Sequence, residues 1–339
     1  MQIIVLLILL FVAALLYIRL AEKRNIVDKP NERSSHSQPT IRGGGILFPV
    51  AWLMFSVYNG FAFPWFTAGL MLISAVSFWD DTGHVPAWLR LLVHIVALSL
   101  CFHELGVMNV FPWWGILLLF VICIGIVNAI NFMDGINGIT GLYSLAIIIP
   151  LIGLWPVPNN DPYFSLSNPA IFIALAIVVF GVFNFRKKAR CFAGDVGSVS
   201  IGFILLFFLL MLFAEVWVPG SDHLYRLEAG DKPDLKLKFI LFFAVYGVDS
   251  VLTIIHRLWL RESIFQPHRK HLYQFLSNEM KWPHLIVASL YAALQLLICL
   301  FVITYEVKLM EALILCVGLG LVYIFSKWFI IKRQLFWTE

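Results

Sequence analysis

Charge is the scarcest property of this 339-residue sequence. Only 13% of its residues are Asp, Glu, Lys or Arg, whereas 61% are hydrophobic, and the mean hydropathy is +0.88. Because a soluble globular protein is about one quarter charged, the composition excludes an ordinary soluble domain. The five cysteines are scattered without a Cys-x-x-Cys spacing, which argues against a zinc site or a disulfide framework. The sequence also lacks internal repeats and low-complexity tracts, so we predict a single integral membrane domain over residues 1–339 and no nucleic-acid partner.

Long apolar runs, in contrast, are abundant. A helix that crosses a bilayer needs roughly 20 mostly apolar residues, and runs near this length fall at 1–18, 45–60, 63–78, 88–105, 114–130, 138–155, 169–185, 199–218, 239–255, 285–304 and 310–331. We therefore predict an all-α polytopic membrane protein with about 11 transmembrane helices. Ten is the alternative, because the break at Asn59 and Gly60 is weak. The first run has no basic segment before it and no small-residue cleavage site, so we expect an anchor rather than a cleaved signal peptide.

The Lys and Arg residues fall mostly on one side of this topology. With 11 spans and an external N-terminus, 19 of the 24 lie on segments that face the cytoplasm. That bias is what the positive-inside rule expects. The polar clusters described next played no part in choosing the orientation, yet all of them then lie at the cytoplasmic face.

The densest polar segment is residues 128–138, NAINFMDGING, which directly follows an apolar run. Polar groups at the mouth of a membrane helix are costly unless they bind something charged. Asn131 and Asp134 share one helical face if the helix continues through them, and glycines on both sides of Asn137 allow a tight turn. A polar helix end closed by glycine would explain only one Asn and one Gly. The segment is therefore a candidate binding site.

Two further clusters supply carboxylates at helix ends. Asp80 and Asp81 follow an apolar run, and adjacent aspartates suit either a divalent metal or a base, although a solvated helix-end pair explains them equally well. Asp195 lies in GDVGS at 194–198 and opens an apolar run, where Asp is also a favoured N-cap. Carboxylates at several helix ends suggest a metal–phosphate site at a membrane surface.

Two loops supply cationic groups. Residues 31–45, NERSSHSQPTIRGGG, combine Arg42 and hydroxyls with three glycines ahead of a helix, which suits either a phosphate cradle or a flexible loop. Residues 266–274, QPHRKHLYQ, form either an anion clamp or a basic surface loop. The cationic side chains of this second loop are His268, Arg269, Lys270 and His271.

Two other charged features lie outside these clusters. The basic run at 186–190 is favoured as an anchor against anionic lipid. Asp249 lies within a predicted span, and an ionisable residue at that depth usually faces a cavity or a partner. Asp249 is therefore a further candidate for the site, with His256 about 10 Å away along the same helix, at its cytoplasmic end.

Together and in this order, the five segments resemble the polyprenyl-phosphate N-acetylhexosamine-1-phosphate transferase family. The resemblance runs from about residue 31 to residue 274, and the blocks at 131–138 and 194–198 carry most of it. The segment 268–273 is similar to the branch that initiates O-antigen and capsule chains. Common-antigen enzymes continue this motif as His-x-His-His, whereas Tyr273 and Gln274 stand here. The His triplet of the peptidoglycan branch is absent, which argues against a MurNAc-pentapeptide substrate.

The resemblance implies a reaction and its partners. Undecaprenyl phosphate and a UDP-N-acetylhexosamine give undecaprenyl-diphospho-sugar and UMP, at the cytoplasmic face of the bacterial cytoplasmic membrane. The cofactor would be Mg²⁺, with Mn²⁺ as the alternative, held by Asn131 and Asp195. Asp80 and Asp81 would act at the lipid phosphate, either as a base or as a charge-positioning pair, and Asp134 is the third catalytic candidate. A strict base is not obligatory, because a phosphate monoester is mostly ionised at pH 7.

The same resemblance implies the substrate contacts. Asn137 would meet the uracil, and Arg269 with His271 would meet the diphosphate or the sugar. The full set of substrate-binding candidates is Asn128, Asn137, Arg269, His271, His268 and Arg42. The sugar (GlcNAc, GalNAc, QuiNAc or FucNAc), the glycan pathway and a homodimeric state stay open. A secondary transporter is the alternative function, but transporters usually place substrate groups near the midplane of repeated halves.

Overall fold

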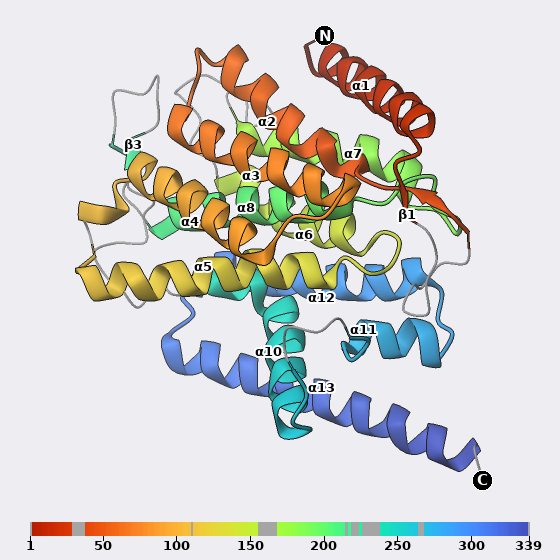
Figure 1. The fold of residues 1–339 in the computed structure, drawn as a ribbon. Coiled ribbons are helices and arrows are strands. Elements are labelled where there is room, and N and C mark those ends of the chain that lie inside the picture. The colour runs from red at the N-terminus through yellow and green to blue at the C-terminus, as the bar shows by residue number, and fades with distance from the viewer. Residues whose placement is uncertain are drawn as a thin grey trace.

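The structure is a computed structural model that describes residues 2–28, 38–109, 111–154, 168–213, 216–217, 224–225, 238–263 and 268–337. Helices make up most of this part of the chain (Figure 1). The α-helices are α1 (Gln2–Arg24), α2 (Leu47–Tyr58), α3 (Pro64–Thr82), α4 (Ala87–Glu104), α5 (Trp113–Met133), α6 (Ile139–Leu154), α7 (Pro169–Asn184), α8 (Gly194–Phe213), α10 (Ala244–Trp259), α11 (Leu272–Gln274), α12 (His284–Thr304) and α13 (Leu309–Trp337).

Short elements connect these helices. Three are tight 3₁₀ turns, η1 (Gly44–Ile46), η2 (Val107–Asn109) and η3 (Lys238–Phe243), whereas η4 (Phe275–Glu279) is a wider π-helical turn. Two antiparallel ribbons pair β1 (Val27–Asp28) with β2 (Thr40–Ile41) and β3 (Val216–Trp217) with β4 (Leu224–Tyr225).

Each apolar run identified in the sequence contains a helix, so the prediction of an all-α polytopic membrane protein is confirmed. Within the described residues, seven helical segments are long and apolar enough to cross a membrane. They are α1, α4, α5, α8, α10 with its leading turn η3, α12 and α13. The apolar helices α2, α6 and α7 are shorter. Eleven crossings therefore stay a prediction.

Helix α8 lies at the centre of the protein, because 89% of its most apolar window is buried, against 11% for α13. A helix that is apolar on every side is stable only when neighbours surround it. Its main neighbours are α3 and α5, whereas α13 crosses the edge of the assembly beside α10 (Figure 1). The central helix α8 and its two main neighbours, α3 and α5, are thus the helices whose ends carry the predicted carboxylates and amides.

The register between α3 and α8 is fixed by side chains within their contact. The rings of Phe66 and Phe207 stack with centroids 4.0 Å apart. Closer to the end of α3, the hydroxyls of Ser74 and Ser200 lie 2.8 Å apart in a buried hydrogen bond. Because the two helices run in opposite directions, this register brings the end of α3 to the beginning of α8.

The triple glycine of the first loop allows a close approach to α8. The Gly44 N–H donates to the Phe192 carbonyl at 2.8 Å, and the Gly45 N–H donates to the Ala193 carbonyl at 3.0 Å. A Cβ on Gly45 would lie 2.3 Å from the Gly197 Cα. These two amides are already bonded, so the phosphate-cradle interpretation is wrong for them. Residues 31–37 of that loop lie outside the described residues.

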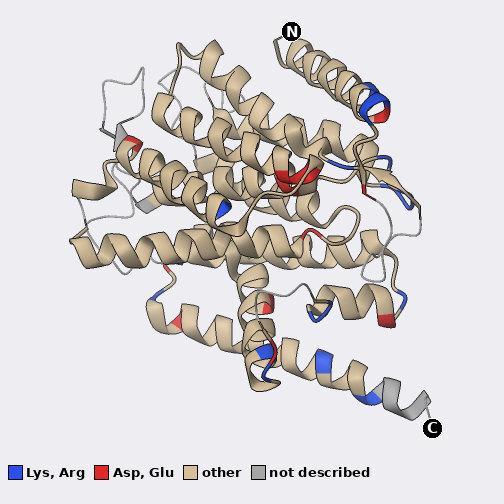
Figure 2. Ribbon diagram, viewed as in Figure 1, with Lys and Arg blue, Asp and Glu red and all other residues tan. Residues whose placement is uncertain are grey.

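Lys and Arg residues lie at the end of α1 and in the loop around β1, and further ones lie at the end of α10 and along α13 (Figure 2). The two aspartates at the end of α3 lie close to the loop around β1 (Figure 2). The orientation predicted from the charge pattern of the sequence stays a prediction.

Candidate active site

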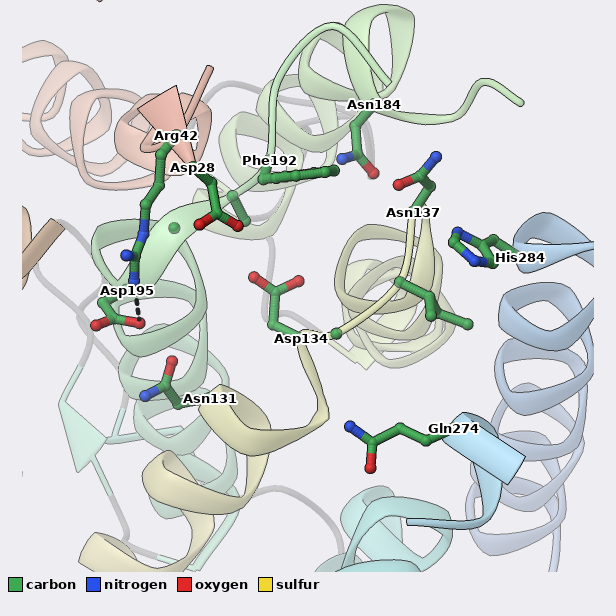
Figure 3. Close-up of a pocket in the computed structure, with 14 residues that line it drawn as sticks. Asp28, Arg42, Asn131, Asp134, Asn137, Asn184, Phe192, Asp195, Gln274 and His284 are labelled. Carbon is green, nitrogen blue, oxygen red and sulfur yellow. Dashed lines mark ion pairs between the residues drawn. The ribbon is translucent and has the colours of Figure 1, made fainter. Parts of the chain in front are cut away.

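The end of α5 and the beginning of α8 border a cavity of about 250 Å³ (Figure 3). Its lining is strongly polar, which is unusual for a membrane protein interior. Five of the residues singled out in the sequence lie on its wall: Arg42, Asn131, Asp134, Asn137 and Asp195. The structure therefore gathers residues that are up to 153 positions apart into one site.

Asn131 and Asp195 are held side by side by the first turn of α8. The Ser198 hydroxyl, three residues after Asp195, donates to the Asn131 Oδ1 at 2.5 Å. On the other side, Arg42 Nη2 lies 3.3 Å from Asp195 Oδ1. The amide oxygen from α5 and the carboxylate from α8 therefore face the same cavity.

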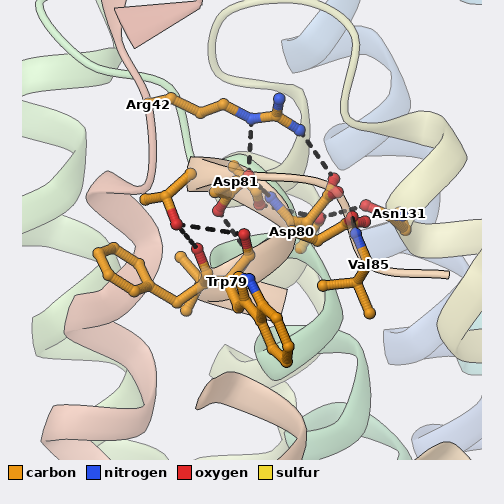
Figure 4. A network of polar contacts seen from close by, with 12 residues as sticks. Arg42, Trp79, Asp80, Asp81, Val85 and Asn131 are labelled. Atoms are coloured by element: carbon orange, nitrogen blue, oxygen red, sulfur yellow. Dashed lines mark hydrogen bonds and ion pairs between the residues drawn. The ribbon is translucent and has the colours of Figure 1, made fainter. Parts of the chain in front are cut away.

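Asp81 supplies the N-terminal cap of α8 from a different helix (Figure 4). Its Oδ1 accepts the N–H of Asp195 at 2.8 Å, and its Oδ2 accepts the N–H of Val196 at 3.0 Å. Arg42 Nε lies 2.6 Å from the same carboxylate, which has no exposed surface. The first amides of a helix need such acceptors. Because Asp81 provides them, the carboxylate of Asp195 is not used as the cap and is left for the cavity.

Asp80 is also bonded within the protein. Its Oδ1 accepts the N–H of Val85 at 2.9 Å, and its Oδ2 pairs with Arg90 Nη1 at 2.9 Å. Neither Asp80 nor Asp81 lines the cavity. Asp80 does lie within hydrogen-bonding reach of Asp195. The roles expected of this pair at a lipid phosphate stay predictions.

Asp134 follows the end of α5, which stops at Met133 rather than continuing. The condition for a shared helical face with Asn131, a helix that continues through both residues, is therefore not met, yet both residues line the cavity. Thr140 donates its hydroxyl to Asp134 Oδ1 at 2.6 Å. Burial raises the pKa of Asp134 to about 6. Its carboxyl therefore takes up a proton at a higher pH than an exposed aspartate does.

Asn137 lies on the cavity wall but is only 6% exposed, because its Nδ2 donates to the Arg186 carbonyl at 3.1 Å. Asn184, which the sequence analysis did not single out, accepts the Gly138 N–H at 2.8 Å. Its amide group also lines the cavity. The signal in the sequence was an amide at the end of an apolar run, the same signal that marked Asn131.

Four other residues on the cavity wall were not among the candidates predicted from the sequence, namely Asp28, Phe192, Gln274 and His284. Asn128 lies one turn earlier on α5 and is not among the lining residues.

A second polar group surrounds His271. Asp249 Oδ1 lies 3.0 Å from His271 Nδ1 and accepts the Leu272 N–H at 3.2 Å, and Asp249 Oδ2 accepts the Tyr291 hydroxyl at 2.7 Å. The expectation that Asp249 faces a partner is therefore confirmed, and its partners are His271, Leu272 and Tyr291. His271 is 3% exposed, and its Nε2 has no hydrogen-bond partner.

His268, in the same loop, is uncharged at neutral pH. Burial, followed by the positive charges around it, lowers the pKa of His268 to about 4, so its ring is neutral at pH 7. An anion clamp would then depend on its neighbours. His268, Arg269 and His271 do not line the cavity described above, whereas Gln274 of the same loop does.

Tyr273 joins this loop to the end of α5. Its hydroxyl donates to the Phe132 carbonyl at 3.2 Å, and the ring lies directly over Gly135. A Cβ on Gly135 would lie 2.2 Å from the Tyr273 hydroxyl oxygen and 3.1 Å from two ring carbons. Glycine at 135 therefore allows the loop to close on the helix end.

We expect Gly135→Ala to lower the midpoint of thermal unfolding, because overpacking of this kind costs about 1–3 kcal/mol. Tyr273→Phe in the same chain should restore part of the loss, since it removes the nearest atom but leaves the ring. Gly153→Ala in α6 is the control, because a Cβ there meets nothing within 4 Å. Equal midpoints for the wild type and Gly135→Ala would contradict the close contact.

The donors at the cavity suit a hard divalent cation. Asn131 and Asp195 offer an amide and a carboxylate oxygen, and Asp80, Asp81 and Asp195 outnumber the arginines Arg42 and Arg90 that pair with them. Within the described residues, no three His, Cys, Asp or Glu side chains form a complete metal cage. Mg²⁺ does not require one, because it usually keeps several waters and phosphate oxygens beside one or two protein oxygens.

Comparison with known proteins adds independent support. The sequence profile of glycosyl transferase family 4 matches residues 63–213. Over 291 residues, the chain is 27% identical to a decaprenyl-phosphate N-acetylglucosaminephosphotransferase of Mycobacterium leprae, covering 76% of this chain and 71% of that protein. A probable undecaprenyl-phosphate N-acetylglucosaminyl 1-phosphate transferase of Bacillus subtilis is 26% identical over 285 residues, covering 76% and 71%.

A more distant similarity points the same way. A phospho-N-acetylmuramoyl-pentapeptide-transferase of Thermotoga neapolitana is 29% identical over 180 residues, covering 47% of this chain and 56% of that protein. The matched segment of the family profile includes the ends of α3 and α5 and all of α8, which build the site. Over about three quarters of its length, the chain is thus similar to enzymes that transfer N-acetylglucosamine phosphate to a polyprenyl phosphate, and its site lies within the segment that matches glycosyl transferase family 4.

Proposed function

We propose that this protein transfers N-acetylhexosamine 1-phosphate from a UDP-sugar to undecaprenyl phosphate, releasing UMP and forming undecaprenyl-diphospho-sugar. The relatives support transfer of a sugar phosphate to a polyprenyl phosphate in a membrane. In this proposal the site faces the cytoplasm of a bacterial cell, and the product begins an O-antigen, capsule or other cell-wall glycan.

The observation that carries the proposal is the meeting of Asn131, Asp195 and Arg42 at one cavity. A pyrophosphate and a lipid phosphate are both anionic, so their reaction needs positive charge between them. Arg42 supplies a fixed positive charge, since its guanidinium bridges Asp81 and Asp195. Two protein oxygens beside it leave room for substrate oxygens.

Mg²⁺, if held by Asn131 and Asp195, would neutralise the diphosphate and withdraw charge from the bond that breaks. The protein's own residues have separate tasks. Asp81 fixes the beginning of α8 and the orientation of Arg42, which keeps the Asp195 carboxylate in the cavity. Asp80, within reach of Asp195, is the carboxylate we assign to the neighbourhood of the lipid phosphate.

The remaining candidate residues are assigned to the uracil, the diphosphate and the sugar by where they lie. Asn137 is a candidate for the uracil, and Asp134, which lines the same cavity, is partly buried with a pKa raised by that burial. Arg269 and His271 remain candidates for the diphosphate or the sugar. Gln274, the residue of that loop on the cavity wall, brings the loop to the nucleotide-sugar side.

An exchange assay tests the reaction. Membranes that contain the full chain should catalyse exchange of labelled UMP into a UDP-N-acetylhexosamine when undecaprenyl phosphate is present. Chelation of divalent ions should stop the exchange, and added Mg²⁺ should restore it. A panel of UDP-sugars then identifies the sugar. Absence of exchange with every UDP-N-acetylhexosamine would refute the proposal.

A further inference from the structure

Helix α13 is mostly exposed, but one of its few buried side chains is a lysine. Between residues 309 and 332, the buried side chains are those of Tyr323, Lys327 and Ile330. Lys327 is 5% exposed, although it lies in an apolar segment long enough to cross a membrane. Burying an ammonium group there is costly unless fixed partners compensate.

The partners of Lys327 lie in the loop that carries His271. Lys327 Nζ donates to the carbonyl of Lys270 at 2.7 Å, and Lys270 directly precedes His271. The same ammonium lies 5.4 Å from the ring centroid of Phe275, at the other end of the segment. One side chain therefore contacts residues 270 and 275, on either side of His271, Tyr273 and Gln274.

A second route connects Lys327 to His271 through side chains. Lys327 Nζ donates to the Tyr323 hydroxyl at 2.8 Å, and this hydroxyl lies 2.8 Å from the Thr253 hydroxyl. Thr253 in turn donates to Asp249 Oδ1 at 3.2 Å. Because a lysine ammonium only donates, the Tyr323 oxygen accepts from it and its proton points to Thr253. The chain of donors ends on the carboxylate of Asp249.

Asp249 determines which atom of His271 is left for a ligand. An ionised carboxylate only accepts, so Nδ1 is the donor in the His271–Asp249 contact. Nε2 then has no partner, although the residue is almost completely buried. A buried polar atom of this kind is uncommon in native proteins. It is the atom that this network orients.

We propose that Lys327 of α13 is a positioning residue, which holds the segment 268–275 against α10 and thereby fixes the side chain of His271. No residue of α13 lines the cavity, so the effect is transmitted through the Lys270 carbonyl and through Tyr323, Thr253 and Asp249. Only the statement that His271 acts at the nucleotide sugar rests on the proposed function.

The first test measures the loop directly in the full-length protein in detergent. Trypsin cuts after Arg269 and Lys270, and the cut sites are read by mass spectrometry. We expect Lys327→Met to be cut about tenfold faster at these sites than the wild type, which corresponds to about 1.4 kcal/mol of lost restraint. Lys332→Met is the control, because Lys332 contacts the exposed Trp328 ring instead. Equal cleavage of Lys327→Met and the wild type would overturn the proposal.

The second test separates positioning from a general structural role. In Lys327→Met the KM for the UDP-sugar should rise about tenfold, again about 1.4 kcal/mol, while the KM for undecaprenyl phosphate stays unchanged. An equal rise in both KM values, or no change in either, counts against the proposal. If Lys327→Met does not fold, Tyr323→Phe removes the bridging hydroxyl, keeps the ring and should shift both measurements the same way. A wild type without any turnover would refute the proposed function, and the cleavage rates would still decide the role of Lys327.

Discussion

Asp195→Asn should lower the rate of sugar-phosphate transfer by at least about 100-fold, the scale of removing one preorganised electrostatic group from an active site. The substitution keeps the shape of the side chain but removes its charge from the cavity that also holds Asn131 and Arg42. The backbone N–H of residue 195 still donates to Asp81, so the beginning of α8 should stay folded. Initial rates with a UDP-sugar and undecaprenyl phosphate, together with a thermal unfolding curve, measure both effects.

Two outcomes would tell whether Asp195 acts through its charge. An activity near that of the wild type would show that the carboxylate is not needed, and a large fall in the unfolding midpoint would show that it is mainly structural. Glu311→Gln is the matched control. Glu311 accepts the Lys308 N–H at 3.0 Å at the exposed start of α13, so it loses the same charge at a helix beginning far from the cavity.

Most of the fold could be predicted from the sequence because it depends on composition. An apolar run long enough for a bilayer has no stable alternative to a helix, since its backbone groups must bond within the segment. The helix ends were less predictable, because they depend on tertiary partners. Helix α8 begins five residues before the predicted run at 199–218. It can include Asp195 because Asp81 of α3 caps its first turn.

The site could be predicted by residue type but not by contact. Clusters of Asn, Asp and Gly at the ends of apolar runs singled out Asn131, Asp134, Asn137 and Asp195, and all four line one cavity. The sequence could not show which carboxylate faces the cavity and which is bonded to backbone, because that depends on the register of α3 against α8. The role of Lys327 was hidden for the same reason, since its partner is a backbone carbonyl 57 residues away.

Asp81→Asn should reduce both stability and activity, and this combination distinguishes it from Asp195→Asn. Asp81 accepts hydrogen bonds from two backbone N–H groups of α8 and pairs with Arg42. Every one of these partners is a donor. An asparagine has only one acceptor oxygen, so its NH₂ group must face a donor in the buried site. We expect a loss of about 2–3 kcal/mol, the scale of a hydrogen bond to a buried charged group, and a lower unfolding midpoint.

Glu104, at the other end of α3, provides the control for this variant. Glu104 Oε2 accepts the N–H groups of Trp65 at 2.7 Å and Phe66 at 3.0 Å, so it caps α3 from α4 as Asp81 caps α8 from α3. Glu104→Gln should therefore lower the unfolding midpoint without changing kcat in the folded fraction. Asp81→Asn should lower kcat as well, because the same cap orients Arg42 and the first turn of α8. If kcat per folded molecule were the same in the two variants, Asp81 would be a helix cap with no further part in the site.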